Sequence, residues 1–156
     1  MFRQLWTNLA SRLKIHRARE IHRARAGRAA SGSLGADGER LAARYLQKLG
    51  YRIVARGHRQ KLGEVDLIAI DGSMLVFVEV KTWRRGEASD PSQAVDARKQ
   101  ERLTRAALVY MKQRNLLEHP ARFDVISIVW PGGNAKPEIR HFVNAFEAVG
   151  KWQMYR

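Results

Sequence analysis

Apolar residues follow two different spacings along this chain, and the helical spacing comes first. Apolar positions three or four residues apart predict a helix with one buried face, which we expect to end at Gly50. Those positions are Leu41, Ala42, Tyr45, Leu46 and Leu49. A second, longer helix is predicted over residues 92–115, directly after Pro91.

Runs rich in Val and Ile predict strands on both sides of the second helix. They cover residues 51–55, 64–70, 74–81 and 122–130, with an edge strand at 139–143. Asp71-Gly72 is typical of the two central residues of a tight hairpin turn between the second and third strands. Residues 29–38 are small and rich in Gly and Ser, as in a linker. The predicted order is helix, three strands, helix, and one or two strands.

The predicted hairpin places three charged side chains on one face of the sheet. With Asp71-Gly72 at the turn, Asp66 lies across from Phe77, and Glu79 and Lys81 follow at steps of two. Asp66 and Glu79 then become diagonal neighbours about 7 Å apart, so both carboxylates could reach one divalent cation. A register slip of one residue would move Asp66 to the opposite face.

Both faces of these strands are otherwise apolar, so the charged side chains are expected to be buried. Two buried carboxylates repel each other, which raises the pKa of at least one of them. A lysine and a metal ion would offset this repulsion, and the same groups suit phosphodiester hydrolysis. Lys81 would orient or deprotonate the attacking water, or stabilise the transition state. The alternative is a buried carboxylate–lysine pair with a purely structural role.

Glu39 is a fourth candidate, because it lies at the edge of the inward face of the first helix. It could complete the metal ligands. Alternatively it is a first-turn acid that the helix dipole favours. Glu64 is not predicted as a ligand.

The net charge of +14 indicates a polyanionic partner, although solubility alone would also account for it. Candidate phosphate contacts lie on one side of the second helix, in the loop that enters the Asp66 strand, and just after Lys81. They are Arg98, Arg102, Arg105 and Lys112; Arg56, Arg59 and Lys61; and Arg84 and Arg85. The alternative for the helix residues is a solvated face. No residue indicates base-specific reading, so we expect structure-directed or non-specific binding of nucleic acid.

The chain has no cysteine, which excludes disulfides, thiolate zinc sites and cysteine nucleophiles. No apolar segment is long enough to span a bilayer, and no signal-peptide pattern is present, so a cytoplasmic protein is expected. Eight Lys and Arg and one Glu fall in residues 1–30. Residues 1–33 are therefore predicted to be a basic extension, either an amphipathic helix or a partly ordered tail. Such a helix could contact a membrane surface.

Several motifs follow one another in an order that resembles a known family. They include Gly38-Glu39, Gly63-Glu64-Val65-Asp66-Leu67-Ile68-Ala69, Val76-Phe77-Val78-Glu79-Val80-Lys81-Thr82, Ala94-Val95-Asp96 with Lys99, and Arg122-Phe123-Asp124-Val125. Over about residues 34–146 the chain resembles the YraN family of small, largely uncharacterised bacterial proteins.

This resemblance implies an α/β, restriction-endonuclease-like fold, akin to archaeal Holliday-junction resolvases, with a central mixed sheet of four or five strands flanked by helices. It assigns residues 34–149 to this domain and residues 150–156 to a C-terminal tail. By motif it also implies that Glu39, Asp66 and Glu79 bind Mg²⁺ or Mn²⁺ and that Lys81 joins them in catalysis. Resolvase-like enzymes often act as two-fold dimers, so a homodimer is one expected arrangement.

The sequence therefore favours a metal-dependent endonuclease acting on DNA, including branched or damaged DNA. A second hypothesis is a non-catalytic nucleic-acid-binding module that keeps the nuclease fold. A third is a membrane-surface or assembly partner that acts through residues 1–30.

Overall fold

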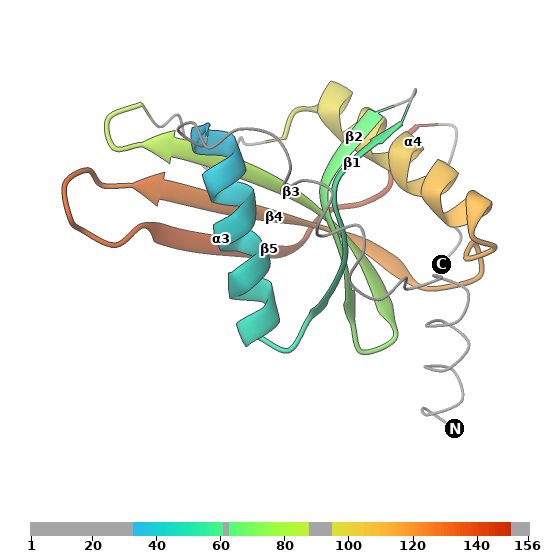
Figure 1. Cartoon of the computed structure of the whole chain (residues 1–156). Coiled ribbons are helices and arrows are strands. Elements are labelled where there is room, and N and C mark those ends of the chain that lie inside the picture. The colour runs from blue at the N-terminus through green and yellow to red at the C-terminus, as the bar shows by residue number, and fades with distance from the viewer. Residues whose placement is uncertain (1–32, 61–62, 88–94, 151–156) are drawn as a thin grey trace.

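The computed structural model describes residues 33–60, 63–87 and 95–150, which form one five-stranded sheet with a helix on each face (Figure 1). The strands lie in the order β1-β2-β3-β4-β5. Their bounds are Arg52–Gln60 (β1), Gly63–Asp71 (β2), Met74–Arg84 (β3), Ala121–Trp130 (β4) and Glu138–Phe146 (β5). The described helices are α3, Leu34–Lys48, and α4, Ala97–Gln113.

The sheet is mixed, because one of its four strand pairs is parallel. β1–β2, β2–β3 and β4–β5 are antiparallel, whereas β3 and β4 run parallel with α4 as the crossover between them. This confirms the predicted mixed α/β sheet flanked by helices, and the arrangement is consistent with a restriction-endonuclease-like fold. None of the helices in the described part of the chain is long and apolar enough to cross a membrane.

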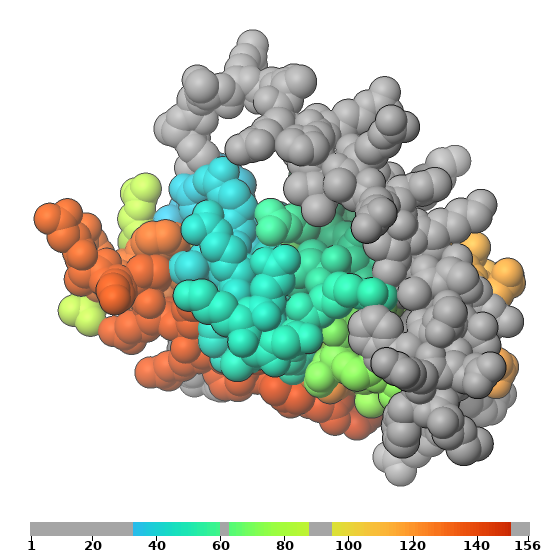
Figure 2. Space-filling model, turned by 60° about the horizontal axis from the view of Figure 1, so that its bottom comes forward, coloured from blue at the N-terminus to red at the C-terminus, as the bar shows by residue number. Residues whose placement is uncertain are grey.

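The sheet is apolar on both faces because each face packs against a helix. On one face, α3 packs against alternate residues of β2, β3 and β4 through Ala42, Ala43 and Leu46. On the other face, α4 packs against the intervening residues through Leu103, Ala106, Ala107, Tyr110 and Met111. Figure 2 shows the outer side of α3 (blue to cyan) at the surface, beside the C-terminal strands (orange to red).

Both helices begin at side-chain caps, and these caps correct two predicted boundaries. Ser33 Oγ accepts the Ala36 N–H, so α3 starts at Leu34 and includes residues assigned to a linker. Asp96 Oδ1 accepts the Lys99 N–H, so α4 starts at Ala97 rather than at residue 92. Residues 92–94 and the predicted extension up to residue 32 lie outside the described residues. Gly50 ends α3 with a positive φ of 92°, as predicted.

The β2–β3 hairpin turns one residue later than predicted. Asp71 pairs with Met74, so Gly72 and Ser73 are the two loop residues. Gly72 has a φ of 59°, which suits the first loop position of a type II′ turn. Asp71 instead stays in the strand and forms an ion pair with Arg122 at 3.0 Å. The strand pairing changes by two positions, so the alternation predicted for the paired residues 67–71 and 74–78 is kept.

All five strands are longer than predicted, and the extensions of β1 and β3 change the setting of several basic residues. β1 continues to Gln60, so Arg56 and Arg59 lie on an edge strand rather than in a loop. Lys61 lies outside the described residues. β3 continues to Arg84, and β5 runs from Glu138 to Phe146.

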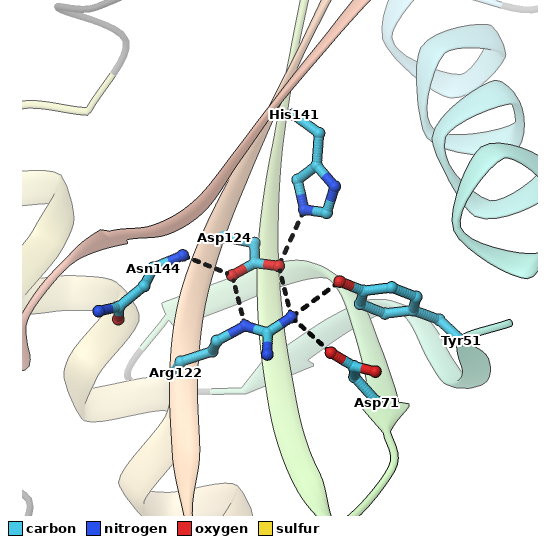
Figure 3. Close-up of polar contacts among 6 residues, drawn as sticks. All are labelled: Tyr51, Asp71, Arg122, Asp124, His141 and Asn144. Atoms are coloured by element: carbon cyan, nitrogen blue, oxygen red, sulfur yellow. Dashed lines mark hydrogen bonds and ion pairs between the residues drawn. The ribbon is translucent and has the colours of Figure 1, made fainter. Parts of the chain in front are cut away.

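A buried ion pair between Arg122 and Asp124 lies at the start of β4 (Figure 3). Asp124 is fully buried, and its carboxylate accepts hydrogen bonds from Arg122 Nε at 2.9 Å and His141 Nε2 at 2.8 Å. The Asn144 N–H donates to the same carboxylate at 2.9 Å. Burial alone would raise the pKa of Asp124, but the hydrogen bonds from His141 and Arg122 hold it below its ordinary value.

The other side of the Arg122 guanidinium joins two further parts of the chain. It donates to the Tyr51 hydroxyl at 2.8 Å, just after α3, and lies 3.0 Å from Asp71 at the hairpin end (Figure 3). One guanidinium therefore connects β4 to the C-terminal end of α3 and to the β2–β3 hairpin, while Asp124 connects β4 to β5.

Asp124→Asn is expected to lower the free energy of unfolding at pH 7 by about 3–5 kcal/mol, because it leaves the buried Arg122 guanidinium without its main counter-charge. The pKa of Asp124 is lowered in the folded state, so this stabilisation is present above about pH 4 and disappears as the pH falls through the folded-state pKa. Urea unfolding of both proteins from pH 7 to pH 2 measures the difference.

Glu138→Gln is the matched control, because its ion pair with Arg85 is exposed and should contribute less than about 1 kcal/mol. Equal effects of the two substitutions at pH 7 would contradict a stabilising role for the buried cluster.

Candidate active site

Glu79 lies near the centre of the sheet on β3 and is the most deeply buried acid of the predicted site, with only 3% of its surface exposed. Its Oε1 lies 3.0 Å from Lys81 Nζ and 3.2 Å from Lys99 Nζ. Its Oε2 is also buried and has no hydrogen-bond partner among the described residues. One carboxylate oxygen thus meets two ammonium groups, while the other is left unsatisfied.

Asp66 lies on β2 where the pairing with β3 stops. Paired residues run from Asp71–Met74 to Leu67–Val78, although both strands continue beyond that point. Asp66 Oδ2 accepts the Val80 N–H at 2.8 Å, so a side chain replaces the backbone acceptor that a regular ladder would supply. Phe77, the residue predicted to lie across from Asp66, instead pairs with Ile68.

The environment of Asp66 opposes its ionisation. Burial, followed by the negative charge of Glu79, raises the pKa of Asp66 to about 7. The Val80 N–H and the Lys99 ammonium act in the opposite direction without cancelling the rise. Near neutral pH this carboxyl therefore exchanges a proton readily, and a bound cation would favour its ionised form.

Glu39 approaches these acids from α3. Burial raises its pKa, and so do the charges of Glu64 and Glu79. It lies in the second turn of α3, and the first-turn acid is Asp37, so the dipole interpretation of Glu39 is wrong. A Cβ on the neighbouring Gly38 would stand 2.0 Å from Thr82 Oγ1. Only glycine permits this close approach of α3 to β3 beside Glu39.

The donor set suits a hard divalent cation in part. Asp66 and Glu79 offer carboxylate oxygens, the donors that Mg²⁺ and Mn²⁺ prefer, and Glu79 Oε2 lacks a partner. In the described part of the chain, no three His, Cys, Asp or Glu side chains are gathered closely enough to hold a metal ion as they stand. Asp66 and Glu79 are therefore the side chains that would hold a metal ion, and Glu39 is the acid that could join them from α3.

The basic residues lie where a polyanion could reach them, but several already have acidic partners. Arg98, Arg102 and Arg105 are exposed along α4, opposite its buried face, and Arg105 pairs with Glu101 at 2.8 Å. Exposed Arg56 and Arg59 lie on β1, where Arg59 pairs with Glu64 at 2.8 Å. Exposed Arg84 and Arg85 lie at the end of β3, where Arg85 pairs with Glu138 at 3.2 Å.

Two residues near this centre were not predicted as part of it. Lys99 lies in the apolar stripe of α4, four residues after Val95 and four before Leu103, and a lysine in such a stripe could have been noticed in the sequence. Ser127 pairs with Lys81 across the β3–β4 ladder. Its buried hydroxyl has no partner among the described residues, and no sequence signal distinguishes it from a core serine.

Relatives of this chain share most of its length but carry no assigned activity. Residues 38–128 match a family described as "Uncharacterised protein family UPF0102". A UPF0102 protein of Geotalea uraniireducens is 50% identical over 121 residues, covering 77% of this chain and 94% of the relative. One from Geobacter sulfurreducens is 48% identical over 114 residues (73% and 88%), and one from Rhodopirellula baltica is 40% identical over 128 residues (80% and 77%). These matches confirm the resemblance seen in the motifs, and the chain belongs to the UPF0102 (YraN) family.

Proposed function

We propose that this protein is a Mg²⁺- or Mn²⁺-dependent endonuclease that hydrolyses phosphodiester bonds in DNA. The observation that carries the proposal is a pair of interacting carboxylates on adjacent strands, Glu79, which is buried, and Asp66, which is partly buried. Their burial is unfavourable without a compensating cation, since each charge loses hydration and repels the other. A purely structural ion pair would need only one acid.

Each residue of the site has a role that its position supports. Asp66 and Glu79 would hold the cation, and Glu39 would add a further oxygen from α3. A bound Mg²⁺ or Mn²⁺ supplies Lewis acidity toward the phosphoryl oxygen and lowers the pKa of a bound water. Lys81, held 3.0 Å from Glu79, would orient the attacking water or stabilise the added charge of the transition state.

The charge distribution supports DNA as the substrate. The net charge is +14, and Arg98, Arg102 and Arg105 follow the exposed side of the helix that also carries Lys99 to Glu79. Side chains of this kind contact phosphates and carry no base specificity. Recognition by DNA shape therefore fits better than recognition of a sequence, and branched or damaged DNA is the substrate class that we infer.

Asp66→Ala and Glu79→Gln are each expected to reduce Mn²⁺-dependent cleavage of a labelled four-way DNA junction by at least about 100-fold, because each removes a carboxylate that would hold the cation. Circular dichroism should show that both variants remain folded. Glu118→Gln, an exposed acid beyond α4, should cleave like the wild type. Wild-type rates in both active-site variants would exclude catalysis at this centre and leave a DNA-binding module.

Asp66→Asn is expected to stabilise the metal-free protein at pH 8. The folded-state pKa of Asp66 is about 7, above its ordinary value of 3.8, so stability is greatest below pH 3.8 and declines as the pH rises through 7. The amide keeps an oxygen for the Val80 N–H without the charge, so we expect a gain of about 1–3 kcal/mol at pH 8.

Chemical denaturation at pH 5 and pH 8 measures this gain. Mn²⁺ should stabilise the wild type at pH 8 and have little effect on Asp66→Asn. If the variant is no more stable than the wild type at pH 8, the surroundings of Asp66 do not disfavour its ionised form.

The double variant Arg98→Ala/Arg102→Ala should bind DNA more weakly and reduce the slope of log Kd against log salt concentration by about two, one phosphate contact for each arginine. Fluorescence anisotropy with labelled DNA measures the slope. Arg44→Ala/Lys48→Ala is the charge-matched control, because both residues are exposed on α3, which packs on the opposite face of the sheet from α4. Equal losses in both double variants would mean that only net charge matters.

A further inference from the structure

Lys99 meets Glu79 from a different element than Lys81 does. Lys81 follows Glu79 by two residues on β3, so its backbone position is fixed by the same strand. Lys99 belongs to the first turn of α4, where the Asp96 cap accepts its N–H at 2.7 Å. Its ammonium nevertheless lies 3.2 Å from Glu79 Oε1, the oxygen that Lys81 already approaches at 3.0 Å. One carboxylate carries a single negative charge, so one lysine would be enough to neutralise it.

The position of Lys99 connects the exposed basic side of α4 with the buried acids. Arg98 and Arg102 lie one residue before it and three residues after it, and both are exposed. The side chain of Lys99 is 29% exposed, whereas Glu79 is 3% exposed. A phosphate chain held along α4 would therefore meet Lys99 before it reached either carboxylate.

We propose that Lys99 is a second active-site lysine, which contacts a non-bridging oxygen of the phosphodiester while Lys81 remains on Glu79. This assignment rests on the proposed function and names the residue that receives its substrate. The flexible four-carbon stem lets the Lys99 ammonium turn from Glu79 to a phosphate oxygen without movement of α4.

The charges around the centre agree with this role. Glu39, Asp66 and Glu79 carry three negative charges when ionised, and Lys81 and Lys99 carry two positive ones, which leaves a net charge of −1. A divalent cation changes this net charge to +1, which matches one phosphodiester anion. Without Lys99 the cation-loaded centre would be neutral, so only the cation itself would attract the phosphate.

The test compares wild type, Lys99→Ala and Lys99→Gln, with Lys136→Ala as an exposed control in the β4–β5 loop. Three quantities are measured: stabilisation by Mn²⁺ in thermal unfolding, affinity for a labelled four-way DNA junction with Ca²⁺ in place of Mn²⁺, and cleavage with Mn²⁺. Both Lys99 variants should keep or increase the Mn²⁺ stabilisation, because Glu79 loses a competing cation. Affinity should fall about 10-fold and cleavage about 100-fold, whereas Lys136→Ala should match the wild type. Lys99→Gln keeps most of the stem, so it serves if Lys99→Ala does not fold.

The proposal is overturned if the Lys99 variants bind and cleave DNA like the wild type, which would make Lys99 a structural link between α4 and β3. Loss of the Mn²⁺ stabilisation in these variants would also overturn it, since Lys99 would then shape the metal site. A wild type that binds DNA without cleaving it, with binding weakened in the Lys99 variants alone, would support the phosphate contact and reject the nuclease activity. A wild type that neither binds nor cleaves DNA would reject both.

Discussion

The candidate site is organised around the burial of Glu79 and the partial burial of Asp66 in a sheet that has a helix on each face. Glu79 is 3% exposed, so its charge cannot be stabilised by bulk water and must be met by the protein. Lys81 and Lys99 provide this compensation from β3 and α4, and the Val80 N–H supports Asp66 where the strand pairing stops. The pKa of Asp66, about 7, shows that the compensation is incomplete. An acid held in this way is suited to exchanging a proton or a cation.

The cluster at the start of β4 has a different electrostatic arrangement. Asp124 and Arg122 are also buried, but every charge there has hydrogen-bond partners, and the pKa of Asp124 lies below its ordinary value (Figure 3). This cluster fixes β4, β5, the hairpin and the end of α3 relative to one another. The sheet therefore contains two charged clusters. The charges around Arg122 and Asp124 are compensated and favour the folded state, whereas those around Asp66 and Glu79 are only partly compensated and oppose it.

The sequence motifs of this UPF0102 protein belong to two separate groups of side chains. The Arg122-Phe123-Asp124 motif belongs to the structural cluster, whereas the Asp66, Glu79 and Lys81 motifs belong to the candidate site. Gly38 belongs to neither group of charges, yet its missing side chain lets α3 bring Glu39 close to β3. A relative that keeps the Arg122-Phe123-Asp124 motif but lacks the acids and the lysine of the candidate site would be expected to fold without sharing the proposed chemistry.

The sequence was enough to predict the amphipathic helices, most of each strand and the alternation within the paired residues of β2 and β3, because that alternation survives a change of pairing by two positions. It did not determine the turn itself. Asp71 lies in the strand and forms an ion pair with Arg122, which follows it by 51 positions in the chain. It also gave no role to Lys99. Only the crossover of α4 over the sheet brings that residue to Glu79, and periodicity says which face a side chain occupies but not which strand lies beneath it.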